Sequence, residues 1–212
     1  MATNLARGGF QILSDTEAGA CATKRVRVAS NNATAIFCGD CLVWTAAGVV
    51  GLATAGAGVI GTSMGADYFD AVSVSRKSGY FLPASTVYSS TSIDMWGETD
   101  QSFLLMSASP VTDRFVAQYS TGLPALTDFS KNANFTAATA GTTYNGMSGH
   151  TLDQTTIAAN ASRDFRIDGP FTSVLSDPTQ GVSTGGIQPS VVVQIKLAAT
   201  QGVPDIVGNA GV

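Results

Sequence analysis

The most restrictive feature of this sequence is a series of short runs in which apolar and polar residues alternate. Residues 24–29 (KRVRVA) put Val26 and Val28 on one face, and residues 190–197 (SVVVQIKL) form the clearest such run. A two-residue period is typical of an extended strand, because successive side chains point to opposite faces. Further runs of this kind lie at 34–44, 68–75, 102–107, 114–119, 165–167 and 171–175. The pattern predicts many short strands.

The composition supports this interpretation, because the residues that favour long helices are scarce. Only 12% of the chain is charged, about half of the roughly 25% of an average soluble domain. Among the acidic residues only Glu17 and Glu98 are glutamates. The 44% of apolar residues is enough to form a core. The sequence therefore predicts an all-β fold, either an antiparallel β-barrel or a β-sandwich, with Gly, Pro and Asn in its turns.

The composition changes along the chain and predicts how it is organised. Residues 1–23 are interpreted as an N-terminal arm, 24–200 as a single β-rich domain, and 201–212 as a C-terminal extension. Within the domain, residues 120–162 are almost free of charge and rich in Thr, Ala, Asn and Gly. Since their apolar residues are mostly alanine, we expect a long inserted surface loop. Long loops in compact domains are often functional.

Charge and targeting signals exclude several classes of function. The net charge of −4 and the scattered basic residues argue against nucleic-acid binding. The one short basic group, Lys24, Arg25 and Arg27, is interpreted as a solvated strand face. Residues 41–66 are uncharged but too rich in Gly and Ala for a membrane span. The first 12 residues do not resemble a secretory signal, and three cysteines do not suit a disulfide framework. We therefore expect synthesis in a cytoplasm.

A glycine-rich run, Gly56–Gly61 (GAGVIG), matches the G-x-G-x-x-G pattern of dinucleotide-binding proteins. That mechanism requires a helix that opens at the third glycine. The residues that follow, Thr62-Ser-Met-Gly, are a poor helix start. The run is therefore interpreted as a turn that enters a strand, and no cofactor is expected.

Cysteine, histidine and carboxylate residues are the candidate catalytic or metal-binding groups of the sequence. Cys38 and Cys41 have metal or redox spacing, but only Cys21 and His150 could complete a zinc site. They are interpreted as small buried hydrophobes. Ser148, His150 and Asp153 share one polar loop, so His150 is expected to be exposed.

Asp164 and Asp168 flank a short strand and are expected to pair with Arg163 or Arg166. Paired carboxylates for glycoside hydrolysis are not marked by the sequence. The sequence predicts no catalytic residue, no cofactor site and no metal site.

Several segments, taken in order, resemble a known family. They are residues 7–12 (RGGFQI), 34–43 (TAIFCGDCLV), 58–61 (GVIG), 145–153 (NGMSGHTLD), 165–170 (FRIDGP) and 191–196 (VVVQIK). In this order and spacing the chain resembles the capsid cement, or head decoration, proteins of tailed bacteriophages. No single motif is diagnostic, so the resemblance lies in the order and spacing of the motifs along the chain.

The resemblance implies a structural virion protein, not an enzyme. Such a protein binds the outside of the capsid and stabilises the lattice of the major capsid protein. It implies a homo-oligomer, with a homotrimer favoured over a homodimer, on the exterior of the virion after synthesis in the host cytoplasm. The expected capsid contacts are Arg7, Gly8, Gly9 and Phe10, within contact segments 2–10 and 120–162.

Two alternatives stay open. One is a β-rich phage tail component or surface adhesin that binds a host receptor, for which Trp96, Glu98 and Asp100 are the candidate aromatic and carboxylate group. The other is a hydrolase whose cleft is not visible in the sequence.

Overall fold

A computed structural model describes residues 9–13, 23–29, 31–70, 75–86, 102–107, 113–121, 125–137, 140–159, 163–170 and 190–195. This part of the chain is all-β, as predicted, and its paired strands are antiparallel. Two short 3-10 helices, η1 (Leu126–Asp128) and η2 (Gln154–Thr156), lie between strands. Within these segments no helix is long and apolar enough to cross a membrane.

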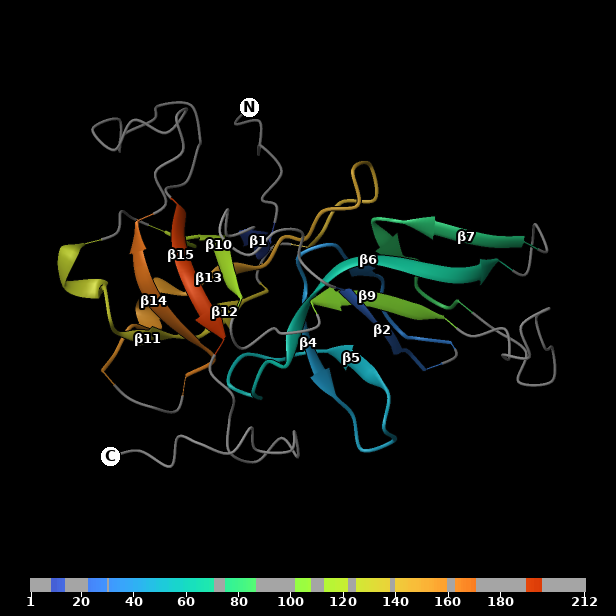
Figure 1. Cartoon of the computed structure of the whole chain (residues 1–212), viewed down its shortest axis with the longest axis horizontal. Helices are drawn as coiled ribbons and strands as arrows, with labels where there is room; N and C mark the ends of the chain where they lie inside the picture. The colour runs from blue at the N-terminus through green and yellow to red at the C-terminus, as the bar shows by residue number, and fades with distance from the viewer. Residues whose placement is uncertain are drawn as a thin grey trace.

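A five-stranded sheet forms one side of the molecule (Figure 1). Its order is β1 (Gln11–Leu13), β10 (Arg114–Gln118), β15 (Ser190–Ile195), β14 (Phe165–Pro170) and β11 (Asn132–Ala133). The central strand β15 comes from the clearest alternating run of the sequence. Val191, Val193 and Ile195 on its inner face are buried.

A six-stranded sheet forms the other side (Figure 1). Its order is β2 (Thr23–Arg27), β9 (Phe103–Ser107), β6 (Gly61–Asp70), β4 (Cys41–Trp44) and β5 (Val50–Leu52), and β7 (Ser75–Gly79) also pairs with β6. Two smaller sheets pair β3 (Ile36–Phe37) with β8 (Phe81–Leu82) and β12 (Phe135–Thr136) with β13 (Thr151–Leu152). Because both larger sheets are open in the described segments, the fold fits a sandwich better than a closed barrel.

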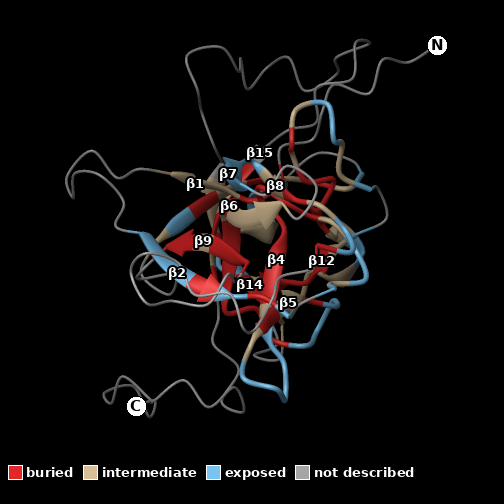
Figure 2. Ribbon diagram, turned by 90° about the vertical axis from the view of Figure 1, so that its right-hand side faces the viewer, coloured by how far each residue is buried: buried red, intermediate tan, exposed pale blue. Residues whose placement is uncertain are grey.

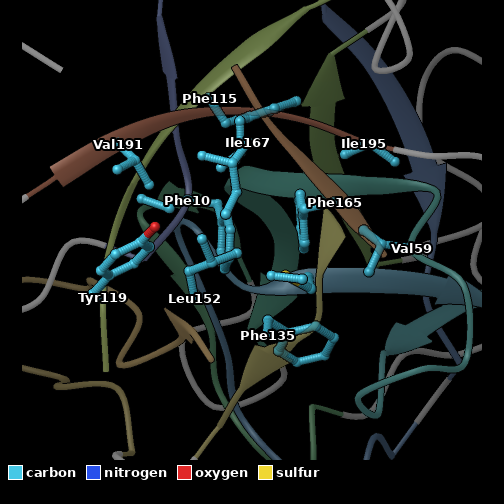
Figure 3. Packing of buried hydrophobic residues seen from close by; sticks show 14 of the residues in the cluster. Phe10, Val59, Phe115, Tyr119, Phe135, Leu152, Phe165, Ile167, Val191 and Ile195 are labelled. Carbon is cyan, nitrogen blue, oxygen red and sulfur yellow. The ribbon is translucent and has the colours of Figure 1, made fainter. Parts of the chain in front are cut away.

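The core consists of two hydrophobic clusters that meet at β4. Cys41 belongs to the first cluster and Leu42 to the second. Alternate side chains of a strand point to opposite faces, so one strand serves both clusters. The first half of β4, Cys41 and Leu42, is buried (Figure 2), whereas Trp44 at its end is exposed. The first cluster contains Phe10, Cys41, Ala53, Val59, Phe115, Ala117, Tyr119, Ala133, Phe135, Leu152, Phe165, Ile167, Val191, Val193 and Ile195 (Figure 3). The second contains Val26, Val28, Ile36, Leu42, Val50, Ile60, Ala66, Leu82, Leu104 and Met106.

Two parts of the predicted organisation need correction. Residues 9–13 are not part of an N-terminal arm, because Phe10 lies in the first cluster and β1 pairs with β10. Residues 120–162 are more than a surface loop, because this segment places Ala133, Phe135 and Leu152 in the same cluster. Its strands are only two residues long, too short to give a periodic signal. The predicted strand at 171–175 and the extension at 201–212 lie outside the described residues.

Candidate functional site

The connection between β3 and β4 is a tight turn that fixes one aspartate side chain. The backbone N–H of Asp40 donates to the carbonyl of Phe37 at 3.0 Å, and the N–H of Phe37 donates to Asp40 Oδ2 at 2.7 Å. Gly39 has a φ of 90°, a backbone conformation that favours glycine. The Gly39-Asp40 pair therefore lies in the turn between β3 and β4, and the Asp40 carboxylate is held on the inner side of this turn.

Segments far apart in the sequence meet at this turn. The carbonyl of Gly39 accepts a hydrogen bond from the N–H of Phe10 (3.0 Å), and the N–H of Gly39 donates to the carbonyl of Ser63 (2.7 Å). The carbonyl of Cys38 accepts from the N–H of Ser148 (2.8 Å). The turn thus connects the N-terminal segment, β6 and the loop before β13.

Asp40, Ser148 and His150 form a buried polar cluster at the turn, with 3%, 1% and 7% of their surface exposed. Ser148 Oγ donates to Asp40 Oδ1 at 2.5 Å and accepts from the backbone N–H of His150 at 2.9 Å. His150 Nδ1 accepts from the N–H of Cys41 at 3.2 Å. A neutral imidazole that accepts at Nδ1 carries its proton on Nε2, which lies 3.5 Å from Asp40 Oδ1.

The connectivity of this cluster differs from that of a hydrolytic triad. In a triad the serine hydroxyl donates to the imidazole, and the carboxylate binds the other ring nitrogen. Here the serine proton goes to Asp40, and a backbone N–H occupies His150 Nδ1. Ser148 is also buried from solvent. This arrangement holds the 140–150 segment on the turn and does not activate the hydroxyl.

The predicted exposure of His150 is wrong. Its ring stacks on Phe135 with the ring centroids 5.0 Å apart. Ser148 lies beside His150 as the sequence suggests, but the acidic partner is Asp40 and not Asp153. Asp153 instead accepts hydrogen bonds from Thr155 at the start of η2. No local pattern links Asp40 to residues more than 100 positions away, so only the fold reveals the cluster.

Burial lowers the pKa of His150 below its usual 6.5, and the negative charge of Asp40 partly opposes this shift. As pH falls, the unfolded chain binds the imidazole proton first. The stability that His150 provides is therefore complete above pH 6.5 and is lost as pH falls through the lower pKa of the folded state. Protonation also removes Nδ1 as the acceptor for Cys41.

We therefore expect the urea midpoint of the protein to fall between about pH 7.5 and about pH 5.5. The pH-dependent shift is expected to be smaller in His150→Gln, which cannot titrate there. Urea unfolding followed by far-UV circular dichroism measures both midpoints. An equal shift in the two proteins would show that other groups are responsible.

The two cysteines of the described segments are free and buried, and Cys41 packs in the first cluster, as predicted. Burial raises the pKa of both thiols, and Asp40 and Asp164 raise the pKa of Cys41 further. Because the thiolate is the nucleophile and the metal ligand, these thiols are poorly suited to either role. Within the described residues no group of three or more His, Cys, Asp or Glu side chains is placed to hold a metal ion; Cys21 lies outside them.

The glycine-rich run is bound by the chain's own carboxylate. The N–H groups of Gly56 and Gly58 donate to Asp164 at 2.8 and 3.2 Å, and both glycines have φ near 80° (78° and 82°). Strand β6, not a helix, begins at Gly61. Backbone N–H groups that would hold a phosphate in a dinucleotide site are thus occupied internally. The prediction of a turn that enters a strand is confirmed.

Asp164, just before β14, and Asp168, within it, have different partners. Burial raises the pKa of Asp164, and its hydrogen bonds from the two glycines partly oppose this. Its carboxylate is therefore engaged mainly by the glycine turn. Asp168 Oδ1 lies 3.8 Å from Arg166 Nε, as expected, and Asp168 Oδ2 lies 3.6 Å from Arg114 Nε.

The predicted capsid contacts are only partly described, and the described ones are not on the surface. Phe10 is 1% exposed and stacks on Phe165, with the ring centroids 4.3 Å apart. A Cβ on Gly9 would lie 2.5 Å from Ser148 Cβ and 2.6 Å from the Gly39 carbonyl oxygen. Gly9 and Phe10 are therefore core residues, which corrects the prediction. Arg7 and Gly8, as well as Trp96, Glu98 and Asp100, lie outside the described residues.

Comparison of the chain with protein-family models, with curated proteins and with solved structures found no match. A functional assignment therefore rests on the contacts of its own residues and on the resemblance of its motifs.

Proposed function

We propose that this chain is a structural virion protein that binds the outside of a tailed-phage capsid and stabilises the major capsid protein lattice. The observation that carries the proposal is the convergence of three of the six motif segments. Residue 10 of the first segment and residue 148 of the fourth both bond to the 37–41 turn of the second. These segments resemble the family only by their order along the chain, yet in the fold they are hydrogen-bonded to the same turn. This contact supports the interpretation that they belong to a single motif.

The commitment of reactive side chains to internal contacts also supports a structural role. Ser148, His150 and Asp40 bind one another or the backbone with a connectivity that differs from that of a hydrolytic triad. Asp164 holds the glycine-rich turn. These groups could suggest a hydrolase or a nucleotide-binding protein, and their internal contacts support a structural role instead.

Exposed apolar residues provide candidate contacts for the capsid. Leu126 and Tyr144, both within the proposed contact segment 120–162, are 85% and 97% exposed. Tyrosine is common at the energetic centres of protein interfaces. We place the other contact in the residues before Gly9. As a homotrimer the protein would combine several such weak contacts, because linked sites bind with greater avidity than single ones.

Co-sedimentation with capsids tests this proposal. We expect the full-length protein to pellet saturably with purified capsids of the tailed phage whose particles carry it. Deletion of residues 2–8 removes most of one proposed contact segment, so it should reduce pelleting. Because Phe10 stays in place, the deletion should not lower the melting temperature. A deletion through residue 10 would be uninformative, because it removes a core side chain.

The two failures of this experiment have different meanings. Unchanged pelleting of the 2–8 deletion would exclude that segment as an anchor. Absence of saturable pelleting by the full-length protein would contradict the proposed function itself.

A further inference from the structure

Three arginines gather on the outer face of the six-stranded sheet. Arg25 and Arg27 lie on β2 and Arg76 on β7, the strands on either side of β9 and β6 (Figure 1). Arg27 is paired across the sheet with Phe103, and Phe103 with Asp67. Paired residues share a face of the sheet. We call the group Arg25, Arg27, Arg76, Phe103 and Asp67 the arginine face.

Contacts within the arginine face hold two guanidinium groups in place. Those of Arg25 and Arg76 lie 4.3 and 5.7 Å from the centroid of the Phe103 ring. Asp67 accepts from Arg25 Nη2 at 2.7 Å and from Arg76 Nε at 2.8 Å. Arg25 uses one nitrogen of its fork for Asp67 and keeps 43% of its side chain exposed. The guanidinium groups are therefore ordered before any partner arrives.

The arginine face is positively charged on an acidic protein. Three arginines and one aspartate leave two positive charges, whereas the whole chain has a net charge of −4. Arg27 is exposed, and no ion pair involves it within the described residues. Exposed ion pairs contribute little to stability, so folding does not account for a third arginine at this place.

We infer that the arginine face binds an acidic protein surface through its carboxylate groups. A guanidinium fork matches the geometry of a carboxylate and binds it with two parallel hydrogen bonds. Phe103 beneath the arginines supplies an apolar floor, and arginines stacked on aromatic rings are common in protein interfaces. The negative charge of Asp67 in the centre of the face would repel a continuous phosphate backbone. The arginine face therefore suits a protein partner better than nucleic acid.

This inference goes beyond the proposed function, because it identifies the chemistry of a partner surface and does not require that partner to be a capsid. The sequence predicts that Lys24, Arg25 and Arg27 lie on a solvated face, and all three residues are exposed. This prediction leaves out the alignment of Arg25 and Arg27 with Arg76, which is some 50 residues away in the sequence.

Fluorescence anisotropy with a labelled deca-glutamate peptide tests the inference on the full-length protein at low salt. Charge reversal in Arg27→Glu is expected to weaken binding at least about tenfold, because it removes one donor fork and adds repulsion. The matched control is Arg114→Glu on the five-stranded sheet, an arginine with 52% of its side chain exposed. The control should stay within about twofold of the wild type if the site is local and not a general charge effect.

Three results would overturn the inference. They are the absence of peptide binding, equal weakening by the two charge reversals, and tighter binding of a labelled oligothymidylate of the same length, which would indicate nucleic acid instead. Melting temperatures establish that both variants are folded. Because capsid pelleting is a separate measurement, weaker peptide binding by Arg27→Glu with unchanged pelleting of that variant would support the arginine face as a site independent of the capsid contact.

Discussion

Replacement of Phe10 by alanine is expected to lower the free energy of unfolding by about 3–5 kcal/mol, the usual cost of removing a buried phenyl ring. The ring is 1% exposed and lies nearly parallel to Phe165, at an interplanar angle of 8°. It also meets Phe135 edge-on, with the centroids 6.5 Å apart. The neighbouring strand β1 and the bond from the Phe10 N–H to Gly39 make collapse of the cavity difficult.

Urea unfolding at neutral pH measures this effect, with Tyr144→Ala as the control. Tyr144 is 97% exposed, so its truncation should change the stability by less than about 0.5 kcal/mol. If Phe10→Ala unfolded at the wild-type midpoint, Phe10 would belong to a detached arm, as the sequence alone suggests.

Replacement of Asp40 by alanine is the second change with a large expected effect. It leaves the N–H of Phe37 and the hydroxyl of Ser148 without their acceptor in a buried place. Each unpaired buried donor is costly, so we expect a loss of about 2–4 kcal/mol. The loss should be accompanied by loosening of the 140–150 segment, since Ser148 connects that segment to Asp40.

Conservative and surface variants separate this effect from a general effect of charge. Asp40→Asn keeps an oxygen for the Phe37 N–H and should lie between alanine and wild type. Asp70→Ala removes a carboxylate that pairs with Lys77 near the surface, so its urea midpoint should move much less. Hydrogen exchange of the amides at 146–150 reports the loosening. A wild-type midpoint for Asp40→Ala would show that the cluster does not stabilise the fold.

The sequence predicts those parts of the fold that depend on local alternation. Strand β15 and the buried Val26 and Val28 follow directly from the two-residue period. The interpretation of the Gly56–Gly61 run as a turn into a strand also follows from local chemistry, since no helix-forming residues come after it.

Features that depend on distant contacts could not be predicted in this way. Phe10 lies outside the alternating runs that predict strands, and it is buried because its ring packs against Phe165 and Phe135. His150 lies in a polar loop, and besides the stacking of its ring on Phe135, its burial depends on the bond from Cys41, 109 positions away. In both cases the partner is far away in the sequence, and no spacing along the chain specifies it.

The most direct test of the proposed role is a cryo-electron microscopy reconstruction of phage particles that carry this chain. We expect density for the all-β domain on the outer capsid surface at the symmetry axes of the lattice. We also expect that Tyr144 or the residues before Gly9 contact the major capsid protein. Density for the chain on the tail, or none on the capsid exterior, would contradict the proposal.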